Sequence, residues 1–313
     1  MNIIKFKRLI IGVMLAVVSC YSIQANAGNE YNTKYPIVLV HGVAGFDSIF
    51  GIDYFYGVRD ALRRKGATVY TPNVTAWEDA YERGQQLVEY LEDLQASLGS
   101  HVKFNLMGHS LGGPTVRYAA KVGGSRLVAS ATTINAVNFG SDFADAALGI
   151  IPIDGGAAAL ISTALNLMGN ITDTLAGNPE YASDAIAAIK FMTTPKANEF
   201  NRSFPDGKPR SRCGGGKGKV KGVRYYSWGG DTTFTNVLDI TDPLLIFTGA
   251  AINGSNDGMV ERCDQHWGKV IGTGYNMNHM DAVNHTFGIH HLWETDPLTL
   301  YKNHAVRLKS AGL

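Results

Sequence analysis

A tight turn between an apolar run and a helix constrains the fold of this chain most strongly. Gly108 to Gly112 read Gly-His-Ser-Leu-Gly, directly after the apolar run Val102 to Met107 and before a helix that begins near Pro114. This strand–turn–helix setting is typical of a nucleophile elbow, whereas an ordinary serine in a helix N-terminal turn does not need it. The glycines are required because larger side chains would collide with neighbouring backbone. The pattern predicts an exposed Ser110 hydroxyl at the head of a helix, where free amides favour negative charge.

The rest of the chain alternates strand and helix signals. Short apolar runs predict further strands at Ile37 to Val40, Ala67 to Tyr70, Leu127 to Ile134 and Val223 to Trp228. Helices are expected from about Asp53 to Lys65, through the leucines from Leu87 to Leu98, and at the C-terminus, where Asp296 can cap and Pro297 can open a helix. Gly214 to Gly222 is expected to form a flexible hairpin or loop. This order predicts an α/β fold with a mostly parallel, doubly wound sheet.

The N-terminus carries an export signal. Lys5, Lys7 and Arg8 precede an apolar run from Leu9 to Val18 that is too short to span a bilayer, and the small-residue cleavage site Ala25 to Ala27 follows. We expect residues 1–27 to be a secretory signal peptide and residues 28–313 to form a single domain without a stable transmembrane anchor. The alternative is lipid attachment through Cys20, which follows a Val-Val-Ser run.

Charge and cysteine content narrow the class of protein. Removal of the signal takes away three of the 28 basic residues and none of the 27 acidic ones, so the mature chain is close to neutral. Nucleic acid is therefore not an expected partner, because it requires a concentrated basic face. Two cysteines, Cys213 and Cys263, remain after cleavage. In an oxidising compartment they form one disulfide, the alternative being two buried free thiols.

A tetrahedral intermediate at Ser110 needs hydrogen-bond donors for its oxygen. The amide of Leu111, just after the nucleophile, supplies one. The second is expected from the loop after an early strand, and His41 to Gly45 directly follow the first predicted strand. Val43 is the candidate, and the alternative is a glycine-rich turn without a catalytic role.

The base must lie downstream of Ser110, because nucleophile, acid and histidine follow one another in this order in such folds. Six histidines qualify: His266, His279, His285, His290, His291 and His304. His304 falls in the expected C-terminal helix, on what we take to be a solvated face. His290 and His291 adjoin and cannot both point into one site, whereas His279 lies in a loop-like segment that suits a catalytic base.

Asp257 is the candidate acid, because Ser255 to Gly258 read as a turn after an apolar run. A turn-forming aspartate and an incidental loop histidine would show the same local patterns. From the residues alone, Asp257 with His279 is therefore one combination among several.

Five segments in the same order resemble the Pseudomonas-type true lipases that Gram-negative bacteria secrete. They are Tyr35 to Gly42, Gly108 to Tyr118, Tyr225 to Trp228, Asn256 to Gly258 and Met277 to Asp281, and the resemblance runs from about Tyr31 to the C-terminus. It implies the α/β-hydrolase fold and a triad of Ser110, His279 as base and Asp257 as orienting acid. The implied activity is hydrolysis of long-chain acyl glycerols through an acyl-enzyme at an oil–water interface.

The resemblance also implies a structural calcium ion near His279. Its carboxylates would come from Asp239 and Asp281, and its backbone carbonyls from His285 and Ile289, since calcium prefers hard oxygen ligands. Alternatives are that the two aspartates are plain turn residues, or that the nearby histidines favour zinc.

A helical lid insertion over about residues 142–184 is implied too, and the apolar stretch Ala157 to Met168 would form its inner face. A buried helical hairpin without motion is the alternative. A periplasmic lipase-specific foldase is an implied partner, and the family places its single disulfide at Cys213 and Cys263.

Two departures from the family weaken the prediction of substrate preference. Leu111 replaces the usual polar residue, and Asn135 to Phe139 replace the usual Gly-Ala-Pro run. A short-chain carboxylesterase or thioesterase with the same triad is one alternative function. A hydrolase-fold binding module is a second, but such modules usually lack a triad member.

Overall fold

The computed structural model describes residues 28–43, 45, 48–49, 52–151, 185–291, 293 and 296–313. The expected signal peptide and the apolar stretch from Ala157 to Met168 lie outside the described residues. Of the expected lid region, the structure describes residues 142–151. The described helices include none that is long and apolar enough to cross a membrane.

The core of the molecule is a seven-stranded sheet with the strand order β4-β1-β5-β6-β8-β7, in which β9 also pairs with β8. Its strands are β1 (Ile37–Val40), β4 (Val69–Tyr70), β5 (Phe104–His109), β6 (Val128–Ile134), β7 (Lys219–Val220), β8 (Val223–Gly230) and β9 (Lys269–Tyr275). All pairs are parallel except β7 with β8, so the glycine and lysine-rich segment forms part of a hairpin. A separate small hairpin joins β2 (Ser48–Ile49) to β3 (Ile52–Asp53).

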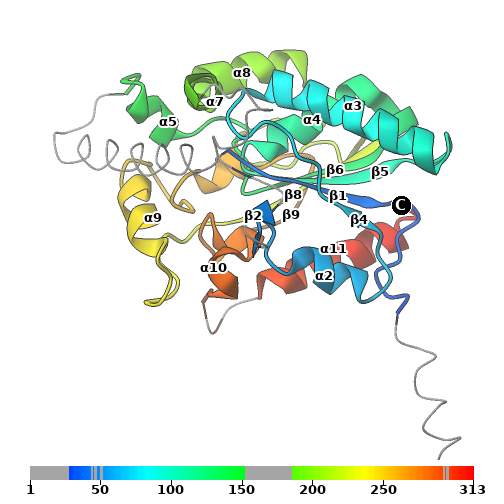
Figure 1. Ribbon diagram of the computed structural model, residues 1–313. Helices are drawn as coiled ribbons and strands as arrows, with labels where there is room; N and C mark the ends of the chain where they lie inside the picture. Colours follow the sequence, from blue (N-terminus) through cyan, green and yellow to red (C-terminus); the bar gives the residue numbers. More distant parts are fainter. Residues whose placement is uncertain are drawn as a thin grey trace, which may run out of the picture.

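Helices cover both faces of this sheet, and Figure 1 shows α3, α4 and α8 on one side with α2 and α11 on the other. The described helices are α2 (Val58–Arg63), α3 (Ala80–Leu98), α4 (Gly112–Leu127), α5 (Asp142–Ala147), α7 (Ala185–Phe191), α8 (Thr194–Ser203), α9 (Asp242–Gly249), α10 (His285–Gly288) and α11 (Pro297–Ser310). Short 3₁₀ turns occupy η1 (Arg262–Gln265) and η2 (Asp281–Val283).

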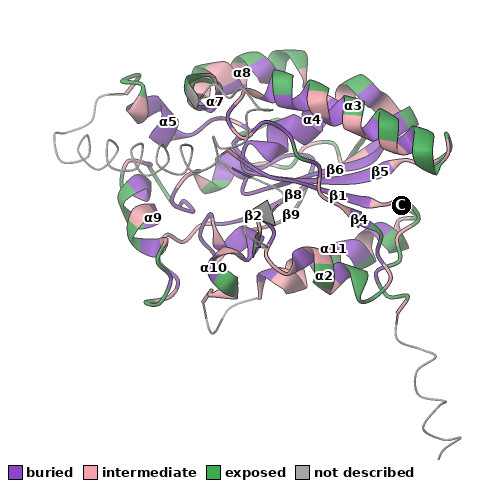
Figure 2. Ribbon diagram, in the orientation of Figure 1, coloured by how far each residue is buried: buried purple, intermediate pink, exposed green. Residues whose placement is uncertain are grey.

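Strand β1 is apolar at every position because both of its faces are buried. Ile37 and Leu39 pack with α2 and α11, whereas Val38 and Val40 pack with α3 and α4. Successive side chains of a strand point to opposite faces, so a strand that is covered on both sides must be apolar throughout. Figure 2 shows the strands buried between the two helix layers. The predicted doubly wound α/β fold is confirmed.

Most predicted elements are present with shifted ends, and the expected helix over 53–65 is the largest correction. The helix begins only at Val58, because Asp53 belongs to β3 and Gly57 takes a left-handed conformation with φ 69°. Helix α3 begins at Ala80, where the Asp79 carboxylate accepts hydrogen bonds from the amides of Tyr81 and Glu82. Helix α11 is capped by Asp296, as predicted.

Candidate active site

The predicted elbow connects β5 to α4. Ser110 has a φ of 55°, which is strained for a residue with a side chain and is common at functional sites. A Cβ on Gly108 would lie 2.0 Å from the carbonyl oxygen of Gly112, and one on Gly112 would lie 2.4 Å from that of Val40. Neither position therefore admits a side chain. The Ser110 side chain heads α4, where the first amides of the helix lack intrahelical partners.

The Ser110 side chain is buried, with 3% of its surface exposed, which differs from the expected exposed hydroxyl. The loop after β1 causes part of this burial. A Cβ on Gly42 would lie only 2.8 Å from the Cβ of Ser110, so this loop approaches the serine as closely as a glycine allows.

The candidate acid and base come together. Nδ1 of His279 lies 2.8 Å from Oδ2 of Asp257, and the His279 amide donates to the Asp257 carbonyl at 2.8 Å. Both side chains are buried. A proton on Nδ1 leaves Nε2 of His279 as the nitrogen that can accept a proton.

Four donors surround the Asp257 carboxylate. Besides His279, the Nδ2 group of Asn135 donates to Oδ2 at 2.7 Å, and the amides of Met259 and Val260 donate to Oδ1 at 2.9 and 2.7 Å. Asn135 follows β6 directly and has a φ of 42°, a left-handed conformation that asparagine tolerates better than most residues. The carboxylate is thereby held in one orientation toward the imidazole.

The loop that carries His279 docks on the elbow through His109. Nε2 of His109 lies 2.9 Å from the carbonyl oxygen of His279, and the two rings lie 4.6 Å apart. Burial, followed by the nearby His279, lowers the pKa of His109 well below its ordinary value, so this ring is neutral. A proton on Nε2 then leaves Nδ1 to accept from the Tyr54 hydroxyl at 2.7 Å. The loop that carries His279 is thus bonded to the residue that precedes Ser110.

The loop after β1, which carries the candidate oxyanion amide of Val43, is held from two sides. The Gly42 amide donates to the Tyr54 hydroxyl at 3.2 Å, and the buried Arg83 guanidinium donates to the His41 carbonyl at 2.5 Å. Burial, and then the charge of Arg83, lowers the pKa of His41 to about 3. Leu111, the other candidate donor, is the fully buried N-cap of α4.

Two loops next to His279 carry the candidate calcium ligands. Asp239 and Asp281 are buried, and within the described part of the chain neither Oδ2 of Asp239 nor Oδ1 of Asp281 has a hydrogen-bond partner. Burial, and to a smaller extent the neighbouring Asp239 and Asp242 carboxylates, raises the pKa of Asp281 to about 7. His285 begins α10, and Ile289 follows this helix directly.

The described residues contain no group of three or more His, Cys, Asp or Glu side chains that could hold a metal ion. A calcium site made of two carboxylates and two backbone carbonyls does not require such a group of three side chains. Buried carboxylate oxygens without donors are the signature of a cation site that uses oxygen ligands. The residues present therefore fit calcium better than zinc, which prefers nitrogen and sulfur ligands.

Cys213 and Cys263 form a disulfide, as predicted. Cys263 lies in η1, which begins five residues after Asp257, and Cys213 lies in the loop between α8 and β7. The bridge ties the segment that follows the candidate acid to the loop between α8 and β7.

The expectation that His304 lies on a solvated face is wrong. It is fully buried, its Nε2 lies 2.9 Å from the Thr132 hydroxyl, and its ring packs against Trp228. Helix α11 turns His304 toward the sheet together with Tyr301 and Leu308, which lie three and four residues away on the same face. Among the other histidines, His266 bonds to the Thr273 hydroxyl at 3.0 Å and His290 to the Gly288 carbonyl at 2.8 Å, so neither pairs with Asp257.

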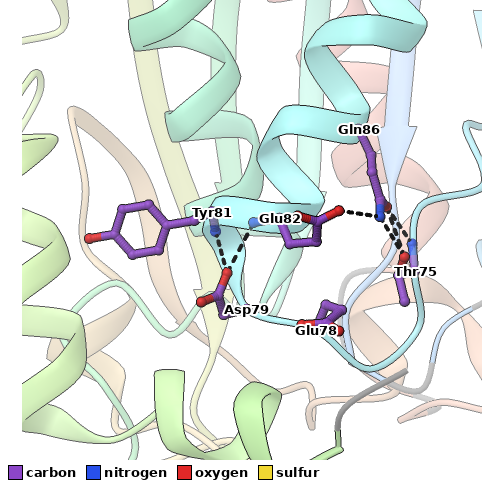
Figure 3. Close-up of a pocket in the computed structure, with 6 residues that line it drawn as sticks. All are labelled: Thr75, Glu78, Asp79, Tyr81, Glu82 and Gln86. Carbon is purple, nitrogen blue, oxygen red and sulfur yellow. Dashed lines mark hydrogen bonds between the residues drawn. The ribbon is translucent and has the colours of Figure 1, made fainter. Parts of the chain in front are cut away.

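A separate pocket of about 380 Å³ opens beside the start of α3 (Figure 3). Its lining residues are Thr75, Glu78, Asp79, Tyr81, Glu82 and Gln86. Asp79 caps α3, and Gln86 bonds to both Thr75 and Glu82. The pocket contains no nucleophile–histidine pair, and its polar groups stabilise the helix start.

Sequence reasoning missed three residues that shape the site: Asn135, Tyr54 and Arg83. Each forms a hydrogen bond to a residue that lies dozens of positions away in the sequence, and none belongs to a sequence motif that predicts this partner. The one available signal was the departure of the segment from Asn135 to Phe139 from the family's usual run.

Known proteins resemble this chain over most of its length. A profile of the alpha/beta hydrolase fold matches residues 35–282. The chain is 46% identical over 282 residues to a triacylglycerol lipase of Vibrio cholerae, covering 90% of this chain and 89% of that protein. It is 36% identical over 297 residues to a triacylglycerol lipase of Pseudomonas fragi, covering 91% and 99%. A crystal structure of a Bacillus licheniformis lipase shares the fold with a TM-score of 0.57 at 19% identity, covering 82% of this chain and 89% of that one.

Proposed function

This chain belongs to the alpha/beta hydrolase family and to its bacterial triacylglycerol lipases, which are carboxylic ester hydrolases, and we propose that it cleaves long-chain acyl glycerols through Ser110, His279 and Asp257. The observation that carries this assignment is the buried His279–Asp257 hydrogen bond of 2.8 Å, on a loop that is bonded to the residue before Ser110. An esterase of this kind needs a nucleophile, a base and an oriented acid within one site.

In the first half-reaction, the Ser110 hydroxyl attacks the ester carbonyl while Nε2 of His279 takes its proton. The carbonyl oxygen becomes an oxyanion, which accepts hydrogen bonds from the backbone amides of Leu111 and Val43. When the tetrahedral intermediate collapses, the imidazolium donates its proton to the departing glycerol oxygen. The acyl group stays on Ser110 as an ester.

In the second half-reaction, water attacks the acyl group while His279 again accepts a proton. Collapse returns this proton to Ser110, and the fatty acid leaves. Asp257 stays ionised and stabilises the imidazolium in both halves through the hydrogen bond to Nδ1. Asn135 positions Asp257 by donating to Oδ2, the same oxygen that bonds to Nδ1 of His279.

Substrate access requires movement, because Ser110 and His279 expose only 3% and 6% of their surfaces. The buried triad supports the hypothesis that residues 142–184 form a lid that opens at an oil–water interface. Segment α5, at the start of this region, packs through Phe143 and Ala146 on Ile252 near the acid.

Calcium is proposed as a structural ion held by the carboxylates of Asp239 and Asp281 and the backbone carbonyls of His285 and Ile289. The orphaned oxygens of the two buried aspartates support this set. A bound ion would supply positive charge that offsets two buried carboxylates and would stiffen the loop that follows His279. Ester cleavage itself uses the protein groups alone.

We further propose that the enzyme is secreted after removal of residues 1–27, and that a periplasmic foldase assists its folding. The basic and apolar order of the N-terminal segment supports export. The foldase rests on the resemblance to secreted lipases of Gram-negative bacteria.

Hydrolysis of emulsified long-chain triglyceride by wild type and Ser110→Ala tests the assignment. The variant should retain its melting temperature and lose activity by about 10⁴-fold or more, since loss of the nucleophile removes the covalent route. Equal rates would contradict the nucleophile. A steep preference of the wild type for nitrophenyl acetate over octanoate would instead favour a short-chain esterase.

A further inference from the structure

We propose that one edge of the molecule is a fixed adsorption surface for uncharged lipid, built from parts of the chain outside the expected lid. This apolar edge consists of the exposed side chains of Phe234, Val237, Leu238, Ile240, Ile246, Phe247, Phe287 and Trp293. The proposal extends the proposed lipase function, because it names the surface that would hold the enzyme on its insoluble substrate.

The loop before α9 has an inverted burial pattern. Val237, Leu238 and Ile240 expose 83%, 70% and 82% of their surfaces, whereas Asp239 between them is 3% exposed. A loop of an ordinary soluble protein turns its carboxylates outward and its aliphatic side chains inward. Here water contacts the aliphatic groups, which favours a partner that removes them from water.

Hydrogen bonds inside the molecule maintain this pattern. Oδ1 of Asp239 accepts from the amide and hydroxyl of Thr241, and Oδ2 of Asp242 accepts from the amides of Thr235 and Asn236. The two aspartates therefore fix the loop from within, and the exposed aliphatic side chains are presented on a braced turn.

The edge also lacks charge over a long stretch. Residues 232–260 contain no lysine, arginine or glutamate, and their three aspartates, Asp239, Asp242 and Asp257, are all buried. Residues 285–291 contain no Asp, Glu, Lys or Arg at all. The first acidic residue after this segment is Glu294, next to Trp293. A surface with so little charge, and no positive charge in these segments, fits a neutral acyl lipid phase better than an anionic membrane.

The parts of the edge are connected to each other and to the catalytic base. Nδ2 of Asn236 donates to the His290 carbonyl at 2.9 Å, which joins the loop before α9 to the segment carrying Phe287 and Trp293. Asn278, the residue before His279, donates to Asp242 at 2.7 Å. Figure 1 shows α9 and α10 on the same side of the molecule, with α9 between α5 and α10.

Phe287 strengthens the case, because its backbone is strained. It has a φ of 58°, follows Thr286 with a φ of 54°, and exposes 65% of its side chain. The ring makes an edge contact with the Tyr56 ring, 5.9 Å between centroids, yet most of its surface remains exposed. Burial of this exposed surface in lipid would help to offset the cost of two consecutive left-handed residues.

The test uses the full mature chain with Ser110→Ala, so that adsorption is measured without hydrolysis. Flotation with triolein droplets coated by zwitterionic phosphatidylcholine should show adsorption that persists in 1 M NaCl, because salt screens charges and not apolar contacts. Adding Val237→Asn and Ile240→Asn should weaken adsorption by about tenfold or more. Both side chains are more than four-fifths exposed, so the fold should tolerate the changes.

Val122→Asn is the matched control, since Val122 is 52% exposed but lies on α4 outside the apolar edge. It should leave adsorption unchanged. In the active enzyme, Val237→Asn with Ile240→Asn should keep the hydrolysis rate of soluble nitrophenyl butyrate within about twofold of wild type. The two readouts separate adsorption from chemistry, so a failed triad assignment would leave the adsorption result intact.

Trp293 provides a spectroscopic signal. It is 87% exposed, whereas Trp77, Trp228 and Trp267 are almost fully buried. Its fluorescence should shift to the blue on adsorption, and Trp293→Phe should remove the shift. Undiminished adsorption of the Asn double variant, adsorption that requires anionic phosphatidylglycerol, or self-association that masks the edge without lipid would each overturn the proposal.

Discussion

Both oxygens of the Asp257 carboxylate accept two hydrogen bonds each, so the orientation of this side chain is fixed. Oδ1 takes the amides of Met259 and Val260, and Oδ2 takes the side chains of Asn135 and His279. Charged hydrogen bonds to a fully buried carboxylate are stronger than neutral ones, and they leave the group little freedom to rotate. In the proposed triad, Asn135 would therefore act on catalysis through the orientation of Asp257.

Asn135→Ala should lower kcat by about 10- to 100-fold and leave KM nearly unchanged, because the lost donor costs roughly 1–3 kcal/mol at the acid. When Asn135→Ala is added to Asp257→Ala, kcat should fall almost no further than in Asp257→Ala alone. Steady-state kinetics on a soluble ester measures both values. Asn105→Ala is the control. Asn105 is also buried and hydrogen-bonded, but to Tyr35 and Ser130, so it should affect stability alone. Full additivity in the double variant would mean that Asn135 does not act through Asp257.

Among the elements, the segment from β8 to η1 carries most of the features that surround the acid. Helix α9 leads into the Asp257 turn, and the disulfide then anchors η1 to the loop before β7. The bridged cysteines are separated by 50 residues, so the closed loop is long. A long loop loses much conformational freedom in the unfolded chain when it is cross-linked.

Cys213→Ser with Cys263→Ser should lower the free energy of unfolding by about 2–4 kcal/mol, the size expected when a loop of this length is released. Denaturant titration of the double variant and of reduced wild type should give similar losses. A smaller fall in kcat is expected as the acid turn loosens. Unchanged stability in both samples would show that the bridge does not restrain the unfolded chain.

At the scale of the whole molecule, the proposed calcium set joins the loop after β8 to the loop after β9. These two loops carry like charges, Asp239 and Asp281, in a region shielded from water. Their repulsion opposes the compact state unless a cation is present. The ion would therefore connect two parts of the sheet that the backbone links only over a long distance.

Calcium chelation should lower both the melting temperature and the activity on soluble esters. At a calcium concentration of 100 times Kd the ion contributes about 2.7 kcal/mol, which calorimetry with and without chelator measures. Asp281→Asn should reproduce the loss and abolish the response to chelator. Magnesium should not restore stability, because it prefers a smaller, hydrated octahedral site. An enzyme that is indifferent to chelator would contradict the calcium assignment.

Acid sensitivity is a second property of the whole molecule, since His41, His109 and His304 are buried with lowered pKa values. In the unfolded chain these rings accept protons below about pH 6.5, whereas the folded state keeps them neutral. The unfolded state then binds more protons, so the free energy of unfolding falls as pH drops below 6.5. Each ring contributes a slope of at most about 1.4 kcal/mol per pH unit.

His304→Gln should reduce this slope, because glutamine can bond to Thr132 without titrating. Denaturant unfolding at several pH values between 7.5 and 5 measures the difference from wild type. Identical slopes would mean that His304 is protonated in the folded state.

The local features of this protein could be read from its sequence. The apolar runs became strands, Gly108 and Gly112 define the elbow, and Asp296 caps α11, because each depends on backbone sterics and hydropathy over a few residues. Burial on both faces likewise explains why β1 is apolar at every position. Local patterns favoured Asp257 with His279 only as one combination among several, and family resemblance decided the choice.

Only the tertiary structure decided which distant side chains meet. Asn135 reaches Asp257 across 122 residues, and Asp257 meets His279 across 22, because the strand order brings the ends of β6, β8 and β9 together. The same packing buried His304, whose helix periodicity alone does not say which face meets the sheet. Local chemistry is encoded by neighbours in sequence, whereas the partner of a buried polar group depends on the global arrangement of the sheet.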